Sequence, residues 1–319
     1  MDYGTLISII VFLVVFVAIT FELVNKAVAA FSGVAILILL KVVDEHHAIG
    51  FIDFETIMLL FGMMIIVSVL KHSGLFTIVS VRISELTRGS PIKILILFSI
   101  VTAVMSAFLD NVTTVLIIIP IIIELTRGLG LDPKKYVLSQ AIISNIGGTA
   151  TLIGDPPNVI IGSKVGLTFN QFLINLGPPV LVIFIVVLIF IWATNRDQFK
   201  PINTNIIKLF TVNLLLEKIR YDFLNMKIDY ALMKKGILFL VIAIILFITQ
   251  TMTGLAPGVV AISAGIFLVL ISGMSLETAM EEVEWSTLMF FVGLFILFFL
   301  ETSIHSLIEE PEVAAEYCG

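Results

Sequence analysis

Two short polar segments of the chain contain the residue types that can bind an ion. The first segment is Phe108-Leu-Asp-Asn-Val-Thr-Thr-Val, and its candidate ligands are Asp110, Asn111, Thr113 and Thr114. The second segment covers residues 145–158, Asn-Ile-Gly-Gly-Thr-Ala-Thr-Leu-Ile-Gly-Asp-Pro-Pro-Asn. Its candidate ligands are Asn145, Gly147, Gly148, Thr149, Thr151, Gly154, Asp155 and Asn158.

The residue types in both segments suit a small cation next to an anion. Pro156 and Pro157 stop a helix, and the glycines allow a backbone that exposes carbonyl oxygens. Carbonyl, hydroxyl, amide and carboxylate oxygens are hard ligands of the kind that Na⁺ needs, whereas helix N-termini favour an anion. The predicted Na⁺ ligands, with no other cofactor, are Asp110, Asn111, Asn145 and Gly148. Asp110 and Asp155 can also carry a proton, so H⁺ is an alternative coupling ion. Either aspartate can in addition cap a helix.

The rest of the chain has the composition of a membrane protein. Of its 319 residues, 59% are hydrophobic and 13% are charged, against about 25% charged in a soluble domain. The single cysteine, Cys318, excludes a disulfide framework and a thiolate metal site. The His46-His47 pair is interpreted as part of a polar loop rather than a metal site. We therefore expect an all-α polytopic membrane protein that is not an enzyme and binds no nucleic acid.

Apolar runs long enough to cross a bilayer recur along the chain. They predict spans near 5–23, 27–43, 56–71, 92–109, 112–123, 137–165, 172–193, 235–252, 257–273 and 286–300. The span at 137–165 contains the Gly/Pro segment, so we predict a broken helix there. The first run has no basic segment before it and no cleavage site after it, which indicates a span rather than a signal peptide.

The placement of Lys and Arg predicts the orientation, because basic loops stay in the cytoplasm. Segments 71–93, 124–136 and 194–235 are basic, whereas loop 44–56 is acidic. We expect a plasma-membrane protein with cytoplasmic basic segments and an external N-terminus.

The same rule affects residues 92–123, which have basic segments on both sides. Both flanks then lie on one side of the membrane, and the simplest path is a re-entrant hairpin with Asp110-Asn111 at its tip. Two full spans with a short external turn are the alternative, although the run 112–123 is short for a span.

The chain also contains an internal repeat. Phe54-Glu-Thr-Ile-Met-Leu-Leu-Phe-Gly-Met-Met-Ile-Ile recurs as Trp285-Ser-Thr-Leu-Met-Phe-Phe-Val-Gly-Leu-Phe-Ile-Leu. The predicted orientation places the copies in opposite directions, as in many secondary transporters. The predicted domains are a first repeat at 1–193, a linker at 194–234, a partial second repeat at 235–300 and a polar tail at 301–319. Segment 203–230 in the linker is either an interfacial amphipathic helix or a plain connection.

At its two polar segments the chain resembles the ion transporter superfamily. The matching residues are Asp110-Asn-Val-Thr-Thr and Gly147-Gly-Thr-Ala-Thr-Leu-Ile-Gly-Asp-Pro-Pro-Asn158. The chain looks closest to the branch with arsenite/antimonite permeases, NhaD-type sodium/proton antiporters and the melanosomal P protein. The resemblance implies a homodimer and two inverted repeats, each with a re-entrant hairpin and a discontinuous helix. It assigns the ion site of the first repeat to Asp110, Asn111, Thr113, Asn145, Gly148, Thr149 and Asp155.

The resemblance also indicates a substrate class. Dicarboxylate-carrying members have Ser-Asn-Thr in the hairpin and Thr before Pro-Pro, where this chain has Asp110 and Asp155. The expected function is Na⁺- or H⁺-coupled secondary transport of an inorganic ion or small anion, of the arsenite/antimonite or Na⁺/H⁺ antiport type. Citrate or dicarboxylate transport is the alternative. The family's second repeat has its own hairpin and broken helix, whereas the predicted spans of this chain stop at 286–300. A truncated or frameshifted product is therefore also expected.

Three further hypotheses stay open. The arsenite permease resemblance allows an efflux channel driven by a partner ATPase. A truncated membrane fragment would insert into the bilayer and carry nothing. An intramembrane aspartyl protease would need Tyr-Asp and Gly-x-Gly-Asp motifs, but Asp110 follows Leu109 and Asp155 follows Leu152-Ile153-Gly154. The sequence therefore disfavours the protease.

Overall fold

The protein is built from α-helices over the part of the chain that the structure describes. The computed structural model describes residues 3–109, 111–196, 217, 221 and 228–309. Asp110, the end of the predicted tail and most of the linker with its interfacial helix lie outside the described residues. The chain divides into two compact units, Met1–Ile57 with Val283–Gly319 and Met58–Glu282.

The helices of each unit begin and end as follows. The first unit contains α1 (Tyr3–Thr20), α2 (Lys26–Leu39), α3 (Glu45–Gly50) and α16 (Trp285–Glu309), and α4 (Phe54–His72) has residues in both units. The second unit contains α5 (Leu75–Thr87), α6 (Pro91–Ser106), α7 (Asn111–Gly128), α8 (Pro133–Gly148), α9 (Pro156–Val165), α10 (Phe169–Thr194), α12 (Tyr230–Ile248), α13 (Gln250–Thr253), α14 (Pro257–Ser272) and α15 (Leu276–Glu281). α6, α8, α9 and α14 start at a proline, which fits the first helical position because no intrahelical bond needs its missing N–H.

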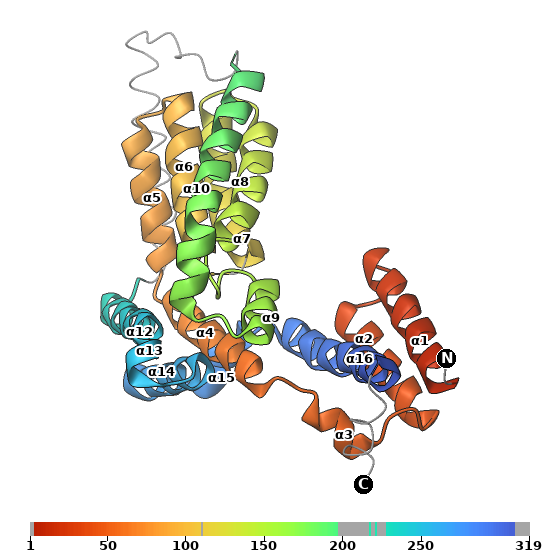
Figure 1. The fold of residues 1–319 in the computed structure, drawn as a ribbon. Coiled ribbons are helices and arrows are strands. Elements are labelled where there is room, and N and C mark those ends of the chain that lie inside the picture. The colour runs from red at the N-terminus through yellow and green to blue at the C-terminus, as the bar shows by residue number, and fades with distance from the viewer. Residues whose placement is uncertain (1–2, 110, 197–216, 218–220, 222–227, 310–319) are drawn as a thin grey trace. The chain divides into compact units, whose positions relative to one another are not determined.

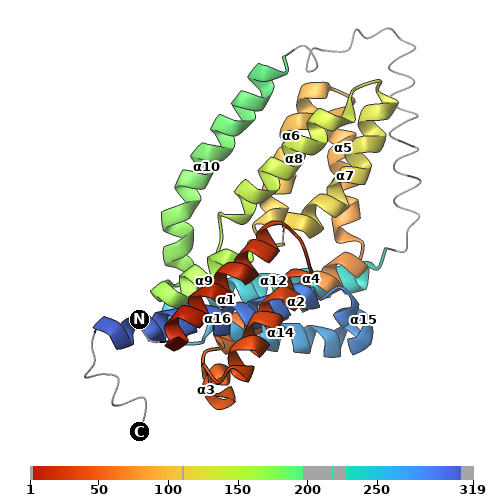
Figure 2. The same ribbon diagram turned by 90° about the vertical axis from the view of Figure 1, so that its right-hand side faces the viewer.

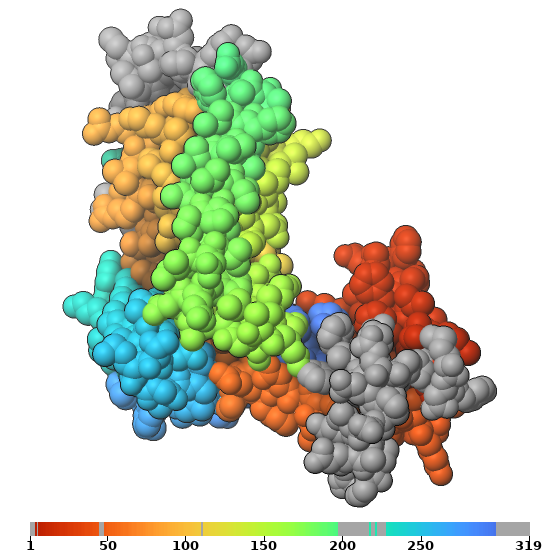
Figure 3. All heavy atoms as spheres, viewed as in Figure 1, coloured from red at the N-terminus to blue at the C-terminus, as the bar shows by residue number. Residues whose placement is uncertain are grey.

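Apolar surface identifies the environment of these helices. The described helices that are long and apolar enough to cross a membrane are Phe54–His72, Asn111–Gly128, Phe169–Thr194 and Tyr230–Ile248. α10 lies on the surface of the second unit (Figure 3), and only 11% of its most apolar window is buried. Its exposed side chains include Ile183, Val186 and Phe190. Such a surface is stable in lipid and unfavourable in water, so the protein is an all-α polytopic membrane protein.

The structure differs from the sequence prediction at α5. Segment 71–93 is basic and is expected to be a cytoplasmic connection, but most of it forms this helix, which packs against α6 and α7. Phe76, Val81 and Thr87 are buried. Arg82 Nη1 lies 3.1 Å from Glu85 Oε2 on the exposed side. The charges therefore occupy one face of an amphipathic helix rather than a loop.

α7 and α16 are longer than the sequence predicts. The apolar run 112–123 stops at Glu124, but α7 continues to Gly128, and its 18 residues extend about 27 Å. This length is sufficient for a membrane span. The run 112–123 therefore does not argue against two full spans by its length. The re-entrant hairpin and the two full spans stay alternative predictions. α16 continues into the predicted tail, because the next proline is Pro311.

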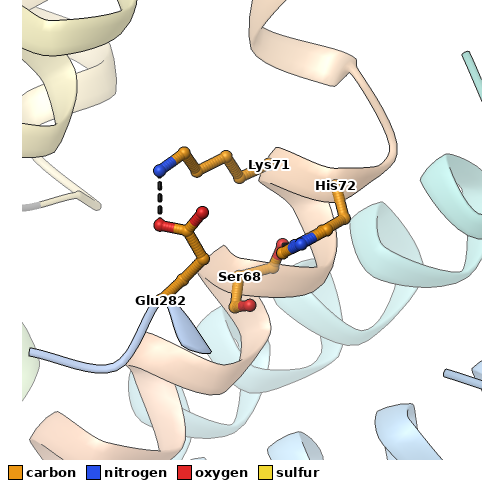
Figure 4. A network of polar contacts seen from close by, with 4 residues as sticks. All are labelled: Ser68, Lys71, His72 and Glu282. Atoms are coloured by element: carbon orange, nitrogen blue, oxygen red, sulfur yellow. Dashed lines mark hydrogen bonds and ion pairs between the residues drawn. The ribbon is translucent and has the colours of Figure 1, made fainter. Parts of the chain in front are cut away.

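The end of α4 is joined to the residue that follows α15. Lys71 Nζ forms an ion pair with the Glu282 carboxylate (Figure 4), and His72 Nδ1 lies 2.9 Å from the Ser68 carbonyl oxygen. The two charged side chains are 38% and 34% exposed, and ion pairs this exposed contribute roughly 0–1 kcal/mol. The pair therefore orients the loop after α15 more than it stabilises the fold.

The two copies of the repeat make matching contacts at a glycine. In the second unit, a Cβ on Gly62 of α4 would lie 2.3 Å from the carbonyl carbon of Ala261 in α14. In the first unit, a Cβ on Gly293 of α16 would lie 2.8 Å from Ala30 Cβ in α2. Both glycines hold the same position in their copies, and each alanine precedes the glycine of its own copy by the same number of residues. A helix of each copy thus crosses a helix of the other, and glycine permits the close approach.

Candidate functional site

Two interruptions of the helices lie next to each other in the second unit. α6 ends at Ser106 and α7 begins at Asn111, while α8 ends at Gly148 and α9 begins at Pro156. α6 and α8 run side by side (Figures 1 and 2), and in the same direction, since their hydrogen-bonded pairs advance together along both helices. The segments that follow them are therefore neighbours. We name residues 107–109, which precede the undescribed Asp110, the first break and residues 149–155 the second break.

Ser106, Asn111 and Asn145 form a hydrogen-bonded group at the breaks, which we name the amide cluster. Ser106 Oγ lies 2.6 Å from both Asn111 Oδ1 and the Ser144 carbonyl oxygen, and the two acceptors share its single proton. Asn111 Nδ2 donates to Asn145 Oδ1 at 3.1 Å. Asn145 Nδ2 donates to the Ala141 carbonyl oxygen at 2.8 Å. α6, α7 and α8 thus each supply one side chain to the amide cluster.

Side chains of the second break and of α9 hold the break against the ends of α6 and α8. Asn158 Nδ2 donates to the carbonyl oxygens of Gly148 at 3.0 Å and of Thr151 at 2.9 Å. Thr151 Oγ1 donates to the Ala107 carbonyl oxygen in the first break and accepts from Gly154 N at 3.0 Å. Thr151 and Asn158 are buried, so these bonds satisfy backbone groups that water does not reach.

Glycine is required where the two breaks touch. A Cβ on Gly148 would lie 2.5 Å from Asn111 Oδ1. A Cβ on Gly154 would lie 2.5 Å from the Gly148 carbonyl oxygen and 2.8 Å from that of Ser106. Gly147 faces α6, where a Cβ would lie 2.4 Å from the Ala103 carbonyl oxygen. The site therefore uses the small size of these three glycines, none of which has a positive φ.

Asp155 and Thr149 lie at opposite ends of the second break. Asp155 is half-buried and extended, with φ −145° and ψ 131°, and its carboxylate makes no capping hydrogen bond to α9. Asp155 therefore occupies the predicted N-cap position of α9, where its backbone carbonyl accepts from Asn158 N at 3.0 Å, but its side chain does not cap the helix. Thr149 Oγ1 donates to the Asn145 carbonyl oxygen at 2.9 Å, and both residues are exposed. The amide cluster is thus open on this side of α8.

The structure separates the predicted site residues into groups. Those at the amide cluster are Asn111, Asn145, Gly148 and Thr149. Those that hold or fit the second break are Gly147, Thr151, Gly154 and Asn158. Thr113 is half-buried, and Thr114 is fully buried with no hydrogen-bond partner for its Oγ1 among the described residues. Since Asp110 lies outside those residues, the complete ligand set stays a prediction.

Sequence reasoning missed Ser106 and Ser144. Serine in an apolar helix is a weak signal by itself, because its hydroxyl often binds a carbonyl of its own helix. The available signal was spacing: Ser99, Thr102 and Ser106 recur every three or four residues along α6. Such a stripe on one face of an apolar helix indicates contact with another helix rather than with lipid.

The amide cluster presents neutral oxygen atoms from two amides, one hydroxyl and the backbone of the breaks. Unwound carbonyls near helix ends coordinate Na⁺ in transporters, and helix N-termini, such as that of α7, favour anionic groups. Within the described ranges, no group of three or more His, Cys, Asp or Glu side chains occurs. The arrangement therefore suits an alkali cation better than a transition metal.

Comparison with known proteins gives consistent matches. The sequence matches the citrate transporter family over residues 16–310. An uncharacterized transporter of Mycobacterium tuberculosis is 36% identical over 300 residues, which cover 92% of this chain and 67% of the relative. A 46 kDa membrane protein of Mycobacterium leprae is 37% identical over 298 residues, with 92% and 67% covered. The P protein of Homo sapiens is 40% identical over 209 residues, which cover 61% of this chain and 25% of the P protein.

Proposed function

Because this chain belongs to the citrate transporter family of membrane transporters, we propose that it is a secondary active ion transporter coupled to Na⁺ or H⁺. The family and the P protein relatives lie in the ion transporter superfamily, which confirms the resemblance of the two polar segments. The names of these relatives describe transporters and membrane proteins rather than enzymes.

The amide cluster is the observation that supports ion coupling most directly. The Asn111 and Asn145 oxygens each accept a hydrogen bond from a neighbouring side chain. A cation takes the place of such donors when the Asn111 amide and the Ser106 hydroxyl rotate. Three of the four predicted Na⁺ ligands are neutral, so the site holds an ion less tightly than a site made of several carboxylates would. The cluster is therefore suited to an ion that binds and leaves.

Na⁺ and H⁺ differ in the residues that they need. A Na⁺ site uses the oxygens of Asn111, Asn145 and the Gly148 carbonyl, completed by Asp110. A proton instead needs a carboxylate, either Asp110 or Asp155. The geometry of the amide cluster favours Na⁺, and the aspartates keep H⁺ coupling as the alternative.

The cargo is an inorganic ion or small anion, of the arsenite/antimonite or Na⁺/H⁺ antiport type. The description of the matched family favours citrate as the second candidate. The N-terminus of α7 at the first break suits either an oxyanion or a carboxylate, whereas α9 begins with two prolines that have no N–H to donate. We further propose a homodimer in the plasma membrane with an external N-terminus, and a partner ATPase only if flux requires ATP.

Reconstitution of the chain into vesicles tests the proposal. Uptake of arsenite, citrate and Na⁺ is measured under imposed Na⁺ and pH gradients, with and without ATP. We expect flux that needs a Na⁺ gradient or a pH gradient and needs no ATP. Flux that ignores both gradients would refute ion coupling. Asp110→Asn and Asp155→Asn distinguish the two coupling ions. Asparagine cannot carry a proton, so pH-driven flux should be abolished, but its amide oxygen can still bind Na⁺, so Na⁺-driven flux should remain.

Asn145→Ala, compared with Asn175→Ala, tests the site itself. Both asparagines donate from Nδ2 to the carbonyl four residues earlier in an exposed helix position, at 2.8 Å for Asn145 and 2.7 Å for Asn175. The two substitutions therefore remove the same local bond, and only Asn145 belongs to the amide cluster. We expect Asn145→Ala to reduce cation-dependent flux at least tenfold and Asn175→Ala to leave it unchanged. Equal flux in the two variants would remove the amide cluster from the mechanism.

A further inference from the structure

A row of buried polar side chains continues from the amide cluster along the contact between α6 and α8. We name it the polar row, and its members are Ser99, Thr102 and Ser106 on α6 and Gln140 and Ser144 on α8. Their spacing of three or four residues places them on one face of each helix. The amide cluster is thus the end of a longer polar contact inside an apolar bundle.

Gln140 lies at the centre of the polar row. Its Oε1 accepts from Thr102 Oγ1 at 2.7 Å, and its Nε2 donates to Ser99 Oγ at 3.5 Å. Gln140 is fully buried, so water does not replace these partners. Gln140 precedes Ser144 by one helical turn, as Thr102 precedes Ser106. The glutamine contact is therefore about 6 Å along the helices from the amide cluster.

Close to the breaks, α6 and α8 contact each other through backbone and small residues. The backbone of Ala103 lies against Gly147, which has no side chain to interlock with α6, and the bond there joins the Ser106 hydroxyl to the Ser144 carbonyl oxygen at 2.6 Å. Small residues let helices approach, but they resist sliding less than interlocked side chains do. Hydrogen bonds are directional, so the bonds of Gln140 fix how far α6 is advanced along α8.

We propose that Gln140 is a positioning residue of the ion site. By holding Thr102 in place, it keeps Ser106 within reach of the Ser144 carbonyl oxygen and of Asn111. This sets the distance between Asn111 and Asn145, although the hydrogen bonds of Gln140 go to Thr102 and Ser99. The effect on ion affinity rests on the proposed function, whereas the effect on the two helices is measured without transport.

A distance between spin labels tests the positioning directly. Val104 on α6 and Leu138 on α8 are 57% and 54% exposed, and the chain has one cysteine, Cys318, to be replaced by serine. Labels at Val104→Cys and Leu138→Cys are expected to give one narrow distance distribution. Gln140→Leu should broaden or shift it. An unchanged distribution in Gln140→Leu overturns the proposal.

Flux in vesicles measures the consequence for the ion. We expect Gln140→Leu to raise the cation concentration for half-maximal flux about tenfold, with a smaller change in maximal rate. Thr102→Val combined with Gln140→Leu removes both side chains of the 2.7 Å bond and leaves only Ser99 without its longer bond, so it should recover most of the thermal stability while the half-maximal concentration stays high. If stability and half-maximal concentration recover together, Gln140 acts through stability alone and is not a positioning residue.

Ser139→Ala is the matched control. Ser139 is also buried, but its Oγ donates at 2.7 Å to the Lys135 carbonyl oxygen within α8. Ser139→Ala should change neither the label distance nor the half-maximal concentration. If flux of the unmodified chain depends on neither Na⁺ nor H⁺, the proposed function fails, and the label distance still decides whether Gln140 positions α6.

Discussion

The two breaks differ in what their polar side chains bind. Around the second break, Thr151 and Asn158 bind backbone groups. At the first break, Asn111 binds the side chains of Ser106 and Asn145. Bonds to the backbone fix the path of the chain, whereas side-chain partners can be exchanged for an ion. The partner of a polar residue therefore indicates whether it supports a break or serves as a ligand.

The first break also depends on the second. Within the first break, the N–H groups of Phe108 and Leu109 donate to the Met105 carbonyl oxygen at 3.0 and 2.8 Å, which tightens the end of α6. Its Ala107 carbonyl oxygen is bound from outside by Thr151. Damage to the second break should therefore reduce stability and displace the first, while damage to the amide cluster should reduce transport with little change in stability.

Gly154→Ala is expected to cause the largest loss of stability. The added methyl group would meet the backbone of Gly148 and Ser106, which cannot move aside as a flexible side chain does. We expect a loss of about 3 kcal/mol in unfolding free energy, measured by thermal unfolding of the purified protein in detergent. Gly177→Ala is the control, because the nearest atom to its Cβ is Leu173 Cδ1 at 3.8 Å. Equal midpoints for the two variants would contradict the close contact of the breaks.

Asn158→Leu should rank next. It removes the donor to two carbonyl oxygens, those of Gly148 and Thr151, and we expect a loss of about 2 kcal/mol in total, near the lower limit for two buried acceptors that lose a hydrogen bond. The same unfolding measurement checks it, with Asn175→Leu on the exposed side of α10 as control. A loss no larger than that of the control would mean that Asn158 does not support the second break.

Thr151→Val should cost less, about 1–2 kcal/mol, because it removes one hydroxyl that joins the two breaks. Thr151→Ser keeps the hydroxyl and should restore most of the stability. Unfolding midpoints of both variants test the difference. If serine fails to rescue, the methyl group of Thr151 matters more than its bond to Ala107.

Asn111→Ala should have the smallest effect on stability and a large effect on function. Asn111 is half-buried and its partners keep other hydrogen bonds, so we expect a loss under about 1 kcal/mol. Cation-dependent flux should nevertheless fall at least tenfold. A variant that unfolds easily but still transports normally would reverse the roles assigned to the two breaks.

Part of this arrangement could be predicted from the sequence. Gly, Pro and Asn clusters between apolar runs are strong signals, so residues 145–158 were recognisable as a break in a helix. The amide cluster was only half predictable, because Asn111 and Asn145 are unusual in apolar helices whereas Ser106 is not. The register between α6 and α8 that brings them together depends on tertiary packing, which no local pattern records.

Helix ends were predicted less well, for a physical reason. The apolar run in α7 stops at Glu124, but a charged residue does not end a helix, whereas the left-handed Gly130, with φ 72°, does. The same error applies to α5, because the charged residues of segment 71–93 indicated a connection between spans. Arg82 and Glu85 instead form an ion pair along a helix. Polarity locates the membrane boundary, and backbone preference locates the end of the helix.

The matching glycines at positions 62 and 293 mean that the duplicated halves have to be inherited together. Each half leaves main chain without side-chain cover, and a helix of the other half supplies that cover. A gene that lost one half would lose both crossings at once. A gene split between the halves would encode two polypeptides, each with a glycine face that the other polypeptide covers.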